Sequence, residues 1–472
     1  MNDELLSSAD SLRLSLRVFA LFAAIYLCTW AGHYTSGDGS LKIAWAKALL
    51  QGQVFDAGPS PGNVYSKYGI GHSLLAVPPL ALADLIQKVT RIRCEPALYT
   101  LMFVVNGALF LALVAFYLSR FYSSRSVWLT VAIIGLATIW WPYTKLDFSE
   151  PFVLTFAFLG FVLIRFGRPA WGILVAGFTL AIRSDSVAMI GPLLIWYLLS
   201  TRSGRDRMRA SFRIAVSLAP SIALVLFANY IRYHSLMDRG YAGESFSNPL
   251  VIGVYGILFS SGKSILLFSP PLLLGILGWK RFARRNASDA WLFLTIGIAQ
   301  VLLFAKWWDW SSDDAWGVRF LIPGVLLMCI PLVEMLERRS VVVLVAALGV
   351  LVQLLAVSAG GLDYLMLIRS QPFERQALYV NGKNRIDFED LRFDPSYSQI
   401  VGNWILLRYL LHIPPVANPP ENAQTVGTRL YDAIPPQVWV AAAHWDFVWN
   451  LRHSAKLGDA KLESADDLTS AH

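Results

Sequence analysis

Long apolar runs alternate with short polar segments along most of the chain. A helix that crosses a bilayer needs roughly 20 mostly apolar residues, and the pattern predicts about eleven spans. Their expected ranges are 14–32, 98–119, 126–142, 151–167, 170–185, 187–200, 212–231, 264–279, 289–306, 319–336 and 340–359. The pattern therefore predicts an all-α polytopic membrane protein with a transmembrane unit over 1–360. A polar region at 361–472 follows, which we expect to be disordered at its end.

Basic residues concentrate in alternate loops, which sets the orientation. Cytoplasmic loops of membrane proteins carry an excess of lysine and arginine. The basic loops are 119–125, 165–168, 200–213, 279–285 and 337–339. We therefore expect the N-terminus inside, with the first loop (33–97) and the C-terminal region on the extracytoplasmic side. The formal net charge of +8 reflects these loops and not nucleic-acid binding.

The first extracytoplasmic loop contains two further helical patterns. In 35–55 the apolar positions recur at helical spacing, which predicts an amphipathic helix lying in the membrane interface with Trp45 at headgroup level. The segment 70–86 is a poor span because Pro78 and Pro79 remove two backbone donors. We interpret 70–86 as interfacial or re-entrant, while the alternative that it spans the bilayer stays open.

Composition narrows the choice of function. Hydrophobic residues make up 56% of the chain and charged residues 15%, against about a quarter charged in soluble domains. The three cysteines form no CxxC or Cys/His spacing, so we expect no disulfide framework and no zinc site. The sequence has no Walker A loop and no convincing GxGxxG motif after a strand, so we do not expect it to bind ATP or a dinucleotide.

Asp38 is the first candidate for chemistry. It lies between Gly37 and Gly39 just after the first apolar run, and the glycines leave room for a sugar to approach the backbone. One interpretation is that Asp38 caps the following helix, because aspartate is a preferred N-cap. The other is that Asp38 is a general base that accepts a proton from an attacking hydroxyl.

Two further pairs lie at the expected outer ends of spans. Asp147 and Glu150, in KLDFSEP, either favour the start of the next helix or bind sugar or acceptor hydroxyls. Arg183 and Asp185, in AIRSDSVA, lie at the break between two short spans, where ionisable groups are costly. They either pair with each other, or Arg183 binds a lipid phosphate while Asp185 contacts the sugar or acceptor.

Other polar groups on the same expected face are candidate ligands. Lys263 follows a flexible Ser-Ser-Gly and either extends to headgroups or binds phosphate, and His72 is a weaker phosphate candidate. In WWDWSSDDAWGVRF, Asp309 and Trp310 have the chemistry of a sugar site and Arg319 that of a phosphate site. Carboxylates in this segment are also suitable ligands for a divalent cation, so metal binding stays open and no other cofactor is expected.

The order of these segments resembles the GT-C glycosyltransferases, membrane enzymes that use polyprenyl-phosphate sugars. The similar stretches are the acid of the first loop, SEPFVLTFAFLG, GILVAGFTLAIRSD, GILFSSGKSILLFSPPLLL and WWDWSSDDAWGVRFLIP, within roughly 20–340. Many members have two adjacent acids in the first loop, whereas this chain has Asp38 alone.

The resemblance implies a bundle of about eleven transmembrane helices with juxtamembrane helices, in the plasma membrane of a bacterium. It also implies transfer of a sugar from polyprenyl phosphate to a glycan, lipid or protein acceptor on the outer face, with inversion. The alternatives are a lipid-linked glycan ligase or polymerase and a lipid or solute transporter. A transporter often shows internal repeats and midplane sites, and neither is evident in this sequence.

Overall fold

A computed structural model describes residues 7–52, 67–201, 203–238, 240–241, 243–312, 315–370, 388–413, 439–440 and 442–448. Within these ranges every regular element is a helix, which confirms the predicted all-helical class. The α-helices of the first half are α1 (Ser8–Cys28), α2 (Gly37–Leu50), α3 (Ile70–Thr90), α4 (Glu95–Leu118), α5 (Ser124–Ala137), α6 (Glu150–Arg165), α7 (Pro169–Ile182), α8 (Val187–Leu199) and α9 (Gly204–Tyr233).

The second half continues with shorter pieces. Its α-helices are α10 (Leu250–Phe259), α11 (Ile265–Phe268), α12 (Leu272–Arg285), α13 (Ala287–Ala305), α14 (Ile322–Cys329), α15 (Arg339–Ser358), α16 (Asp363–Ser370), α17 (Phe388–Phe393) and α18 (Gln399–Leu410). The 3-10 turns are η2 (Pro142–Thr144), η3 (Ser184–Ser186), η4 (Arg319–Leu321), η5 (Ile330–Met335) and η7 (Pro395–Tyr397).

Six of the described helices are long and apolar enough to cross a membrane: α1, α3, α4, α9, α13 and α15. The predicted number of about eleven spans is therefore not confirmed. Two predicted spans are broken in the structure. The range 264–279 divides at Pro270 and Pro271, and the range 319–336 divides into η4, α14 and η5 around Pro323 and Pro331. Proline has no backbone N–H and so interrupts the helical hydrogen bonds.

The helix α3 departs from the prediction in the other direction. It runs without a break through Pro78 and Pro79 for 21 residues, and its length and composition suit a span. The fixed φ of proline is itself helical, so two prolines can be accommodated at the loss of two hydrogen bonds. Length and composition alone therefore leave both interpretations of this segment, interfacial and spanning, in place.

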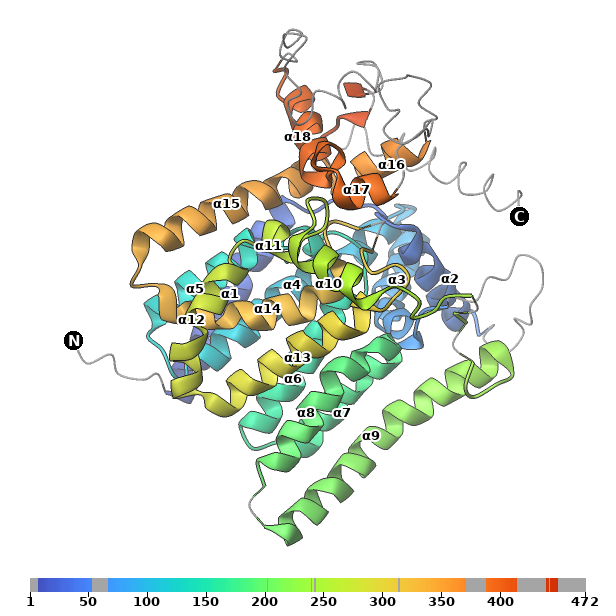
Figure 1. Cartoon of the computed structure of the whole chain (residues 1–472). Coiled ribbons are helices and arrows are strands. Elements are labelled where there is room, and N and C mark those ends of the chain that lie inside the picture. The colour runs from blue at the N-terminus through green and yellow to red at the C-terminus, as the bar shows by residue number, and fades with distance from the viewer. Residues whose placement is uncertain are drawn as a thin grey trace.

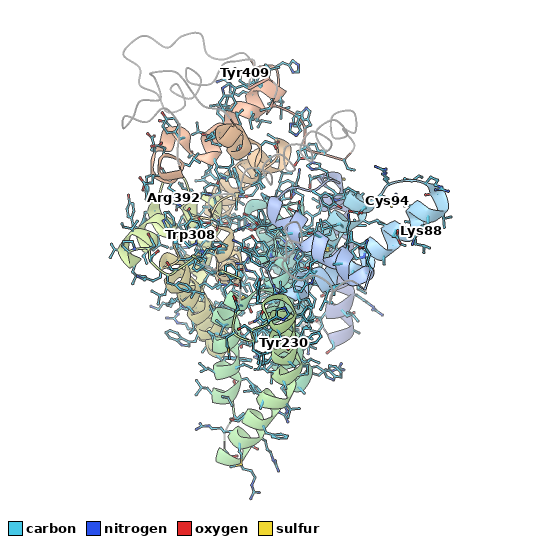
Figure 2. All side chains as sticks on the ribbon, turned by 90° about the vertical axis from the view of Figure 1, so that its right-hand side faces the viewer. Lys88, Cys94, Tyr230, Trp308, Arg392 and Tyr409 are labelled. Carbon is cyan, nitrogen blue, oxygen red and sulfur yellow. The ribbon has the colours of Figure 1, made fainter. Side chains whose placement is uncertain are left out.

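The helices pack as a bundle with a small helical region at one end (Figure 1). There α16, α17 and α18 gather above the ends of α11 and α15, while α9 runs along the edge of the bundle. Turned by 90°, the same end carries Tyr409 uppermost, with Arg392 and Trp308 beneath it (Figure 2). The C-terminal region therefore covers one end of the transmembrane bundle.

The helix α2 has one buried face and one exposed face. The prediction that Trp45 lies at headgroup level is wrong, because Trp45 is 3% exposed. The Arg232 guanidinium of α9 lies 4.5 Å from the centre of the Trp45 ring, and α2 packs against α3. Lys42 of α2 is 1% exposed. Neighbouring helices thus cover the face of α2 that carries Lys42 and Trp45.

Candidate active site

Charged side chains from five places in the sequence meet where α2 and α6 begin and α7 ends. Because α6 and α7 are joined by a short turn, the start of α6 and the end of α7 lie at the same end of the bundle. The group comprises Asp38 and Lys42 of α2, Asp147 before α6, Glu150 of α6, Arg183 and Asp185 after α7, and Arg319 of η4. Six of these seven residues were candidates from the sequence.

Asp38 does not cap α2. The N-cap is Ser36, whose hydroxyl accepts a hydrogen bond of 3.1 Å from the Gly39 N–H. The Asp38 carboxylate instead accepts hydrogen bonds from the Tyr68 hydroxyl at 2.5 Å and from Arg319 Nη1 at 2.9 Å. The capping interpretation is therefore wrong, and Asp38 faces the charged cluster with 24% of its side chain exposed.

The surroundings of Asp38 favour its charged form. Burial would raise its pKa, but the charges of Arg319 and Lys42 and the hydrogen bond from Tyr68 together hold the pKa of Asp38 well below its usual range. The carboxylate is thus ionised at any physiological pH.

Arg319 links Asp38 to Glu150. Its side chain is 10% exposed, its Nη1 contacts Asp38, and its Nε lies 3.4 Å from Glu150 Oε1. The guanidinium also lies 4.2 Å from the centre of the Phe148 ring, a cation–π distance. Arg319 is therefore fixed by two carboxylates and an aromatic face beside Asp38.

Arg183 continues the same chain of charges. It donates to Glu150 at 2.9 Å through Nη1 and to both Asp185 oxygens through Nε at 3.0 Å. The mutual ion pair expected for Arg183 and Asp185 is present, and Glu150 joins it. Carboxylates and guanidiniums thus alternate in the order Asp38, Arg319, Glu150, Arg183, Asp185, which orients each group by its two neighbours.

Asp147 holds the first turn of α2. Its Oδ1 accepts from the Thr35 hydroxyl at 2.7 Å, and its N–H donates to the same hydroxyl at 2.9 Å. Burial raises the pKa of Asp147, and hydrogen bonds from Ser36 and Thr35 oppose that rise. An ideal Cβ on Gly39 would lie 1.8 Å from Asp147 Oδ2. The space beside Gly39 is therefore filled by Asp147, and our expectation that it admits a sugar is wrong.

The two glycines beside Asp38 offer a matched test. Gly39→Ala forces Asp147 out of contact with α2, and such overpacking costs about 1–3 kcal/mol. Gly37→Ala meets nothing within 4 Å and is expected to change stability by about 0.5 kcal/mol at most. Thermal unfolding of both purified variants checks this. Equal midpoints would mean that Asp147 does not hold the turn.

The structure places four sequence candidates outside this cluster: Lys263, Trp310, Asp309 and His72. Lys263 is 1% exposed, and its ammonium donates to the carbonyls of Ser312, Ala315 and Gly317 at 3.3, 2.8 and 3.3 Å. These carbonyls precede Arg319, so Lys263 fixes the loop that delivers Arg319. Trp310 is 1% exposed and Asp309 lies 3.9 Å from Arg392 Nη2. A buried indole cannot present its face to a sugar, and both residues pack towards the C-terminal region.

His72 is also a packing residue in this structure. It is fully buried, and its Nε2 lies 3.1 Å from the Tyr99 hydroxyl. The rings of Phe103 and Phe152 surround it, with centroids 5.8 and 5.4 Å away. A side chain enclosed by aromatic rings is poorly placed to meet a phosphate.

Sequence reasoning missed Lys42. Hydrophobic periodicity alone does not reveal which side of a helix faces a site. The available signal was its position one turn after Asp38, since residues four apart lie on the same face of a helix. Among the described residues, no group of three or more histidine, cysteine, aspartate or glutamate side chains is arranged to hold a metal.

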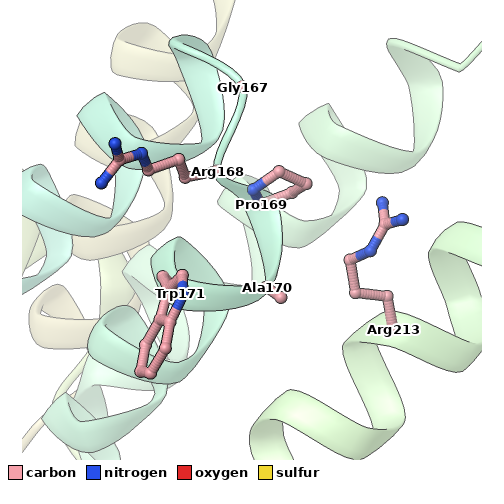
Figure 3. Close-up of a pocket in the computed structure, with 6 residues that line it drawn as sticks. All are labelled: Gly167, Arg168, Pro169, Ala170, Trp171 and Arg213. Carbon is pink, nitrogen blue, oxygen red and sulfur yellow. The ribbon is translucent and has the colours of Figure 1, made fainter.

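A cavity of about 400 Å³ lies at the other end of α6, lined by Gly167, Arg168, Pro169, Ala170, Trp171 and Arg213 (Figure 3). The 16 residues of α6 place it about 24 Å from Glu150, at 1.5 Å per residue. None of the candidate site residues lines this cavity, so it does not belong to the charged cluster.

No protein-family model matches the sequence, and no curated protein matches it. Among solved structures, the chain is similar to ArnT from Cupriavidus metallidurans in the apo state. The sequence identity is 15% and the TM-score 0.46, covering 86% of this chain and 71% of that one. For ArnT from the same organism bound to undecaprenyl phosphate, the identity is 14% and the TM-score 0.45, covering 86% and 72%. The similarity thus extends over most of the chain at low identity.

Proposed function

We propose that the protein transfers a sugar from a polyprenyl-phosphate carrier to a hydroxyl of a glycan, lipid or protein acceptor. The observation that carries the proposal is the Asp38 carboxylate, which is partly exposed and is oriented by Tyr68 and Arg319. A catalytic base must be fixed in place yet reachable by substrate, and Asp38 meets both conditions. Transfer takes place on the extracytoplasmic face, where the sugar arrives on a lipid because nucleotide sugars are absent.

The reaction is a single displacement with inversion at the anomeric carbon. The acceptor oxygen attacks that carbon from the side opposite the phosphate, and the bond between the anomeric carbon and the phosphate oxygen breaks. The hydroxyl proton passes to Asp38, and the polyprenyl phosphate leaves with the bonding electrons. Arg319, next to Asp38, stabilises the negative charge that develops on the leaving phosphate.

The low pKa of Asp38 in the free protein makes it a weak base until substrate binds. A donor phosphate brings negative charge next to Asp38 and shares the Arg319 guanidinium. Both effects raise the pKa of a neighbouring carboxyl. Donor binding thus moves Asp38 towards the range in which it can accept a proton.

This coupling predicts two different pH profiles. The profile of kcat/KM reports the free enzyme and that of kcat reports the enzyme–substrate complex. Because a lowered pKa keeps Asp38 ionised down to acid pH, kcat/KM should lack an acid limb from Asp38 between about pH 5 and 8. The acid limb of kcat should lie at higher pH than that of kcat/KM. Coincident limbs in the two profiles would contradict the coupling.

The proposed function is tested with purified protein in detergent micelles. The donor is undecaprenyl phosphate bearing a radiolabelled sugar, and the acceptors are supplied as envelope extracts. Transfer appears as label on the acceptor together with release of undecaprenyl phosphate. A transporter would leave the labelled donor intact, and a ligase or polymerase would move a whole glycan in place of one sugar. Either of these results would replace the proposal.

A further inference from the structure

Lys42 is a buried cation whose ammonium is not paired with a carboxylate. It is 1% exposed, and its Nζ lies 4.8 Å above the centre of the Tyr68 ring. Within the described ranges no hydrogen bond or ion pair of this ammonium is present. Its position in α2, four residues after Asp38, puts both side chains on one face of the helix.

Two other buried lysines show what the fold does when a lysine is structural. Lys145 forms an ion pair with Asp446 at 2.7 Å and donates to the Val357 carbonyl at 3.1 Å. Lys263 donates to three carbonyls. Buried charges are normally paired or hydrogen-bonded because desolvation is costly. Among the three buried lysines of the described residues, Lys42 alone lacks such partners, which indicates that its partner is a ligand.

The pKa of Lys42 is lowered overall, although the influences on it oppose one another. Burial lowers the pKa of Lys42, while the charges of Asp38, Glu150 and Asp147 raise it and that of Arg319 lowers it. The nearby arginines are already engaged: Arg183 by two carboxylates, and Arg319 by Asp38 with Glu150 close by. Lys42 is therefore the cation of the cluster with donors left to offer.

We propose that Lys42 binds the phosphate of the polyprenyl-phosphate donor, with its Nζ–H groups donating to the non-bridging oxygens. This inference rests on the proposed function, in which the donor phosphate lies across the anomeric carbon from the acceptor oxygen that Asp38 deprotonates. The arrangement puts the base and the phosphate-binding residue one helical turn apart on α2. The turn is held by Ser36 and by the contact between Gly39 and Asp147, so the spacing of the two groups is set by the backbone.

The test compares two lysines of α2. Lys42→Met keeps the length of the side chain and removes its charge. Lys47→Met is the matched control, because Lys47 is half-exposed and pairs with Glu95 at 2.6 Å, away from the cluster. Binding of undecaprenyl phosphate is measured in detergent micelles by microscale thermophoresis. We expect Lys42→Met to raise Kd about tenfold or more and Lys47→Met to leave it unchanged.

The thermal midpoint of the ligand-free protein separates binding from packing. If Lys42 serves a ligand, its replacement removes a buried ammonium that has no hydrogen bond or ion pair among the described residues, so the midpoint of Lys42→Met stays equal to that of the wild type or rises. If Lys42 is structural, the midpoint falls. A fall in midpoint, or an unchanged Kd in Lys42→Met, overturns the assignment while leaving the proposed function standing. Failure of the wild type to bind undecaprenyl phosphate overturns both the assignment and the proposed donor.

Discussion

Asp38→Asn should leave the protein folded and reduce sugar transfer by about 10²–10⁴-fold, the usual effect of losing a general base. Asparagine has nearly the same size and can still accept one hydrogen bond from Tyr68 or Arg319, but its amide cannot take a proton at neutral pH. Arg319 keeps its neighbour Glu150, whose Oε1 lies 3.4 Å from Arg319 Nε. The measurement is the rate of transfer from radiolabelled lipid donor, together with the thermal midpoint of each protein.

Ser36→Ala is the control that separates catalysis from capping. The Ser36 hydroxyl accepts from the Gly39 N–H, so its removal should cost about 1 kcal/mol of stability. It leaves the Asp38 carboxylate in place, so the transfer rate should stay within a few-fold of the wild type. The two variants should thus show opposite patterns of stability and activity. An Asp38→Asn protein with near-normal transfer would remove Asp38 from the mechanism.

Much of the site is readable from the sequence because its residues lie at helix ends. Alternating apolar runs and basic loops placed Asp38, Glu150, Arg183 and Arg319 on one face of the protein, and the structure brings these four side chains within hydrogen-bond or ion-pair distance of one another. The alternation of spans and loops was enough to predict this shared face, because consecutive turns of a helical bundle lie at opposite ends of it.

The functions of individual lysines were not readable in the same way. Lys263 and Lys42 both follow or occupy short helical patterns, and a cation near a predicted membrane boundary suggests headgroup contact. What distinguishes them is that Lys263 donates to the carbonyls of Ser312, Ala315 and Gly317, whereas the Lys42 ammonium has no such acceptor among the described residues. A backbone segment about 50 residues away supplies these acceptors, and no local pattern predicts where an irregular loop turns its carbonyls.

The positions of proline in the sequence predict the helix breaks only in part. Pro270 with Pro271, Pro323 and Pro331 divide two predicted spans, while Pro78 and Pro79 leave α3 continuous. The same residue type therefore ends a helix in one place and is accommodated in another. The difference comes from whether neighbouring groups satisfy the freed carbonyls, which is a property of the packed structure.

The C-terminal region illustrates a limit of another kind. The sequence presents 361–472 as a polar addition, yet Asp446 is 4% exposed against the bundle. Its N–H donates to the Ser358 carbonyl at 3.1 Å, and the Val448 N–H donates to the Trp30 carbonyl at 2.7 Å. The Asp446 carboxylate lies 2.6 Å from His33 Nε2. Contacts between residues more than 400 positions apart in the sequence produce no periodic pattern that a single sequence can reveal.

The largest effect on stability is expected at Lys145, which joins the bundle to this region. Lys145 and Asp446 are 2% and 4% exposed and lie 2.7 Å apart. Lys145→Met removes the lysine from the buried Asp446 carboxylate and leaves His33 beside it. Removing one partner of a buried ion pair costs about 3–5 kcal/mol. Unfolding by SDS in mixed micelles measures the loss.

Lys47→Met is again the matched control, because its ion pair with Glu95 is equally short at 2.6 Å but has side chains 45% and 29% exposed. Exposed pairs contribute about 0–1 kcal/mol, so the two variants should differ several-fold in their effect. The charges of Lys145 and His33 overcome the opposing effect of burial and hold the pKa of Asp446 below its usual range. The pair's contribution should therefore be the same at pH 6 and pH 8, and should be lost only below the ordinary aspartate value of about 3.9.

A double variant completes the argument. Lys145→Met with Asp446→Leu replaces the pair by apolar side chains of similar volume, a change that is often neutral or stabilising. The double variant should therefore recover most of the stability that Lys145→Met loses, because the cost lies in the unpaired carboxylate. If Lys145→Met and Lys47→Met destabilise the protein equally, the contact between the C-terminal region and the bundle is not held by this buried pair.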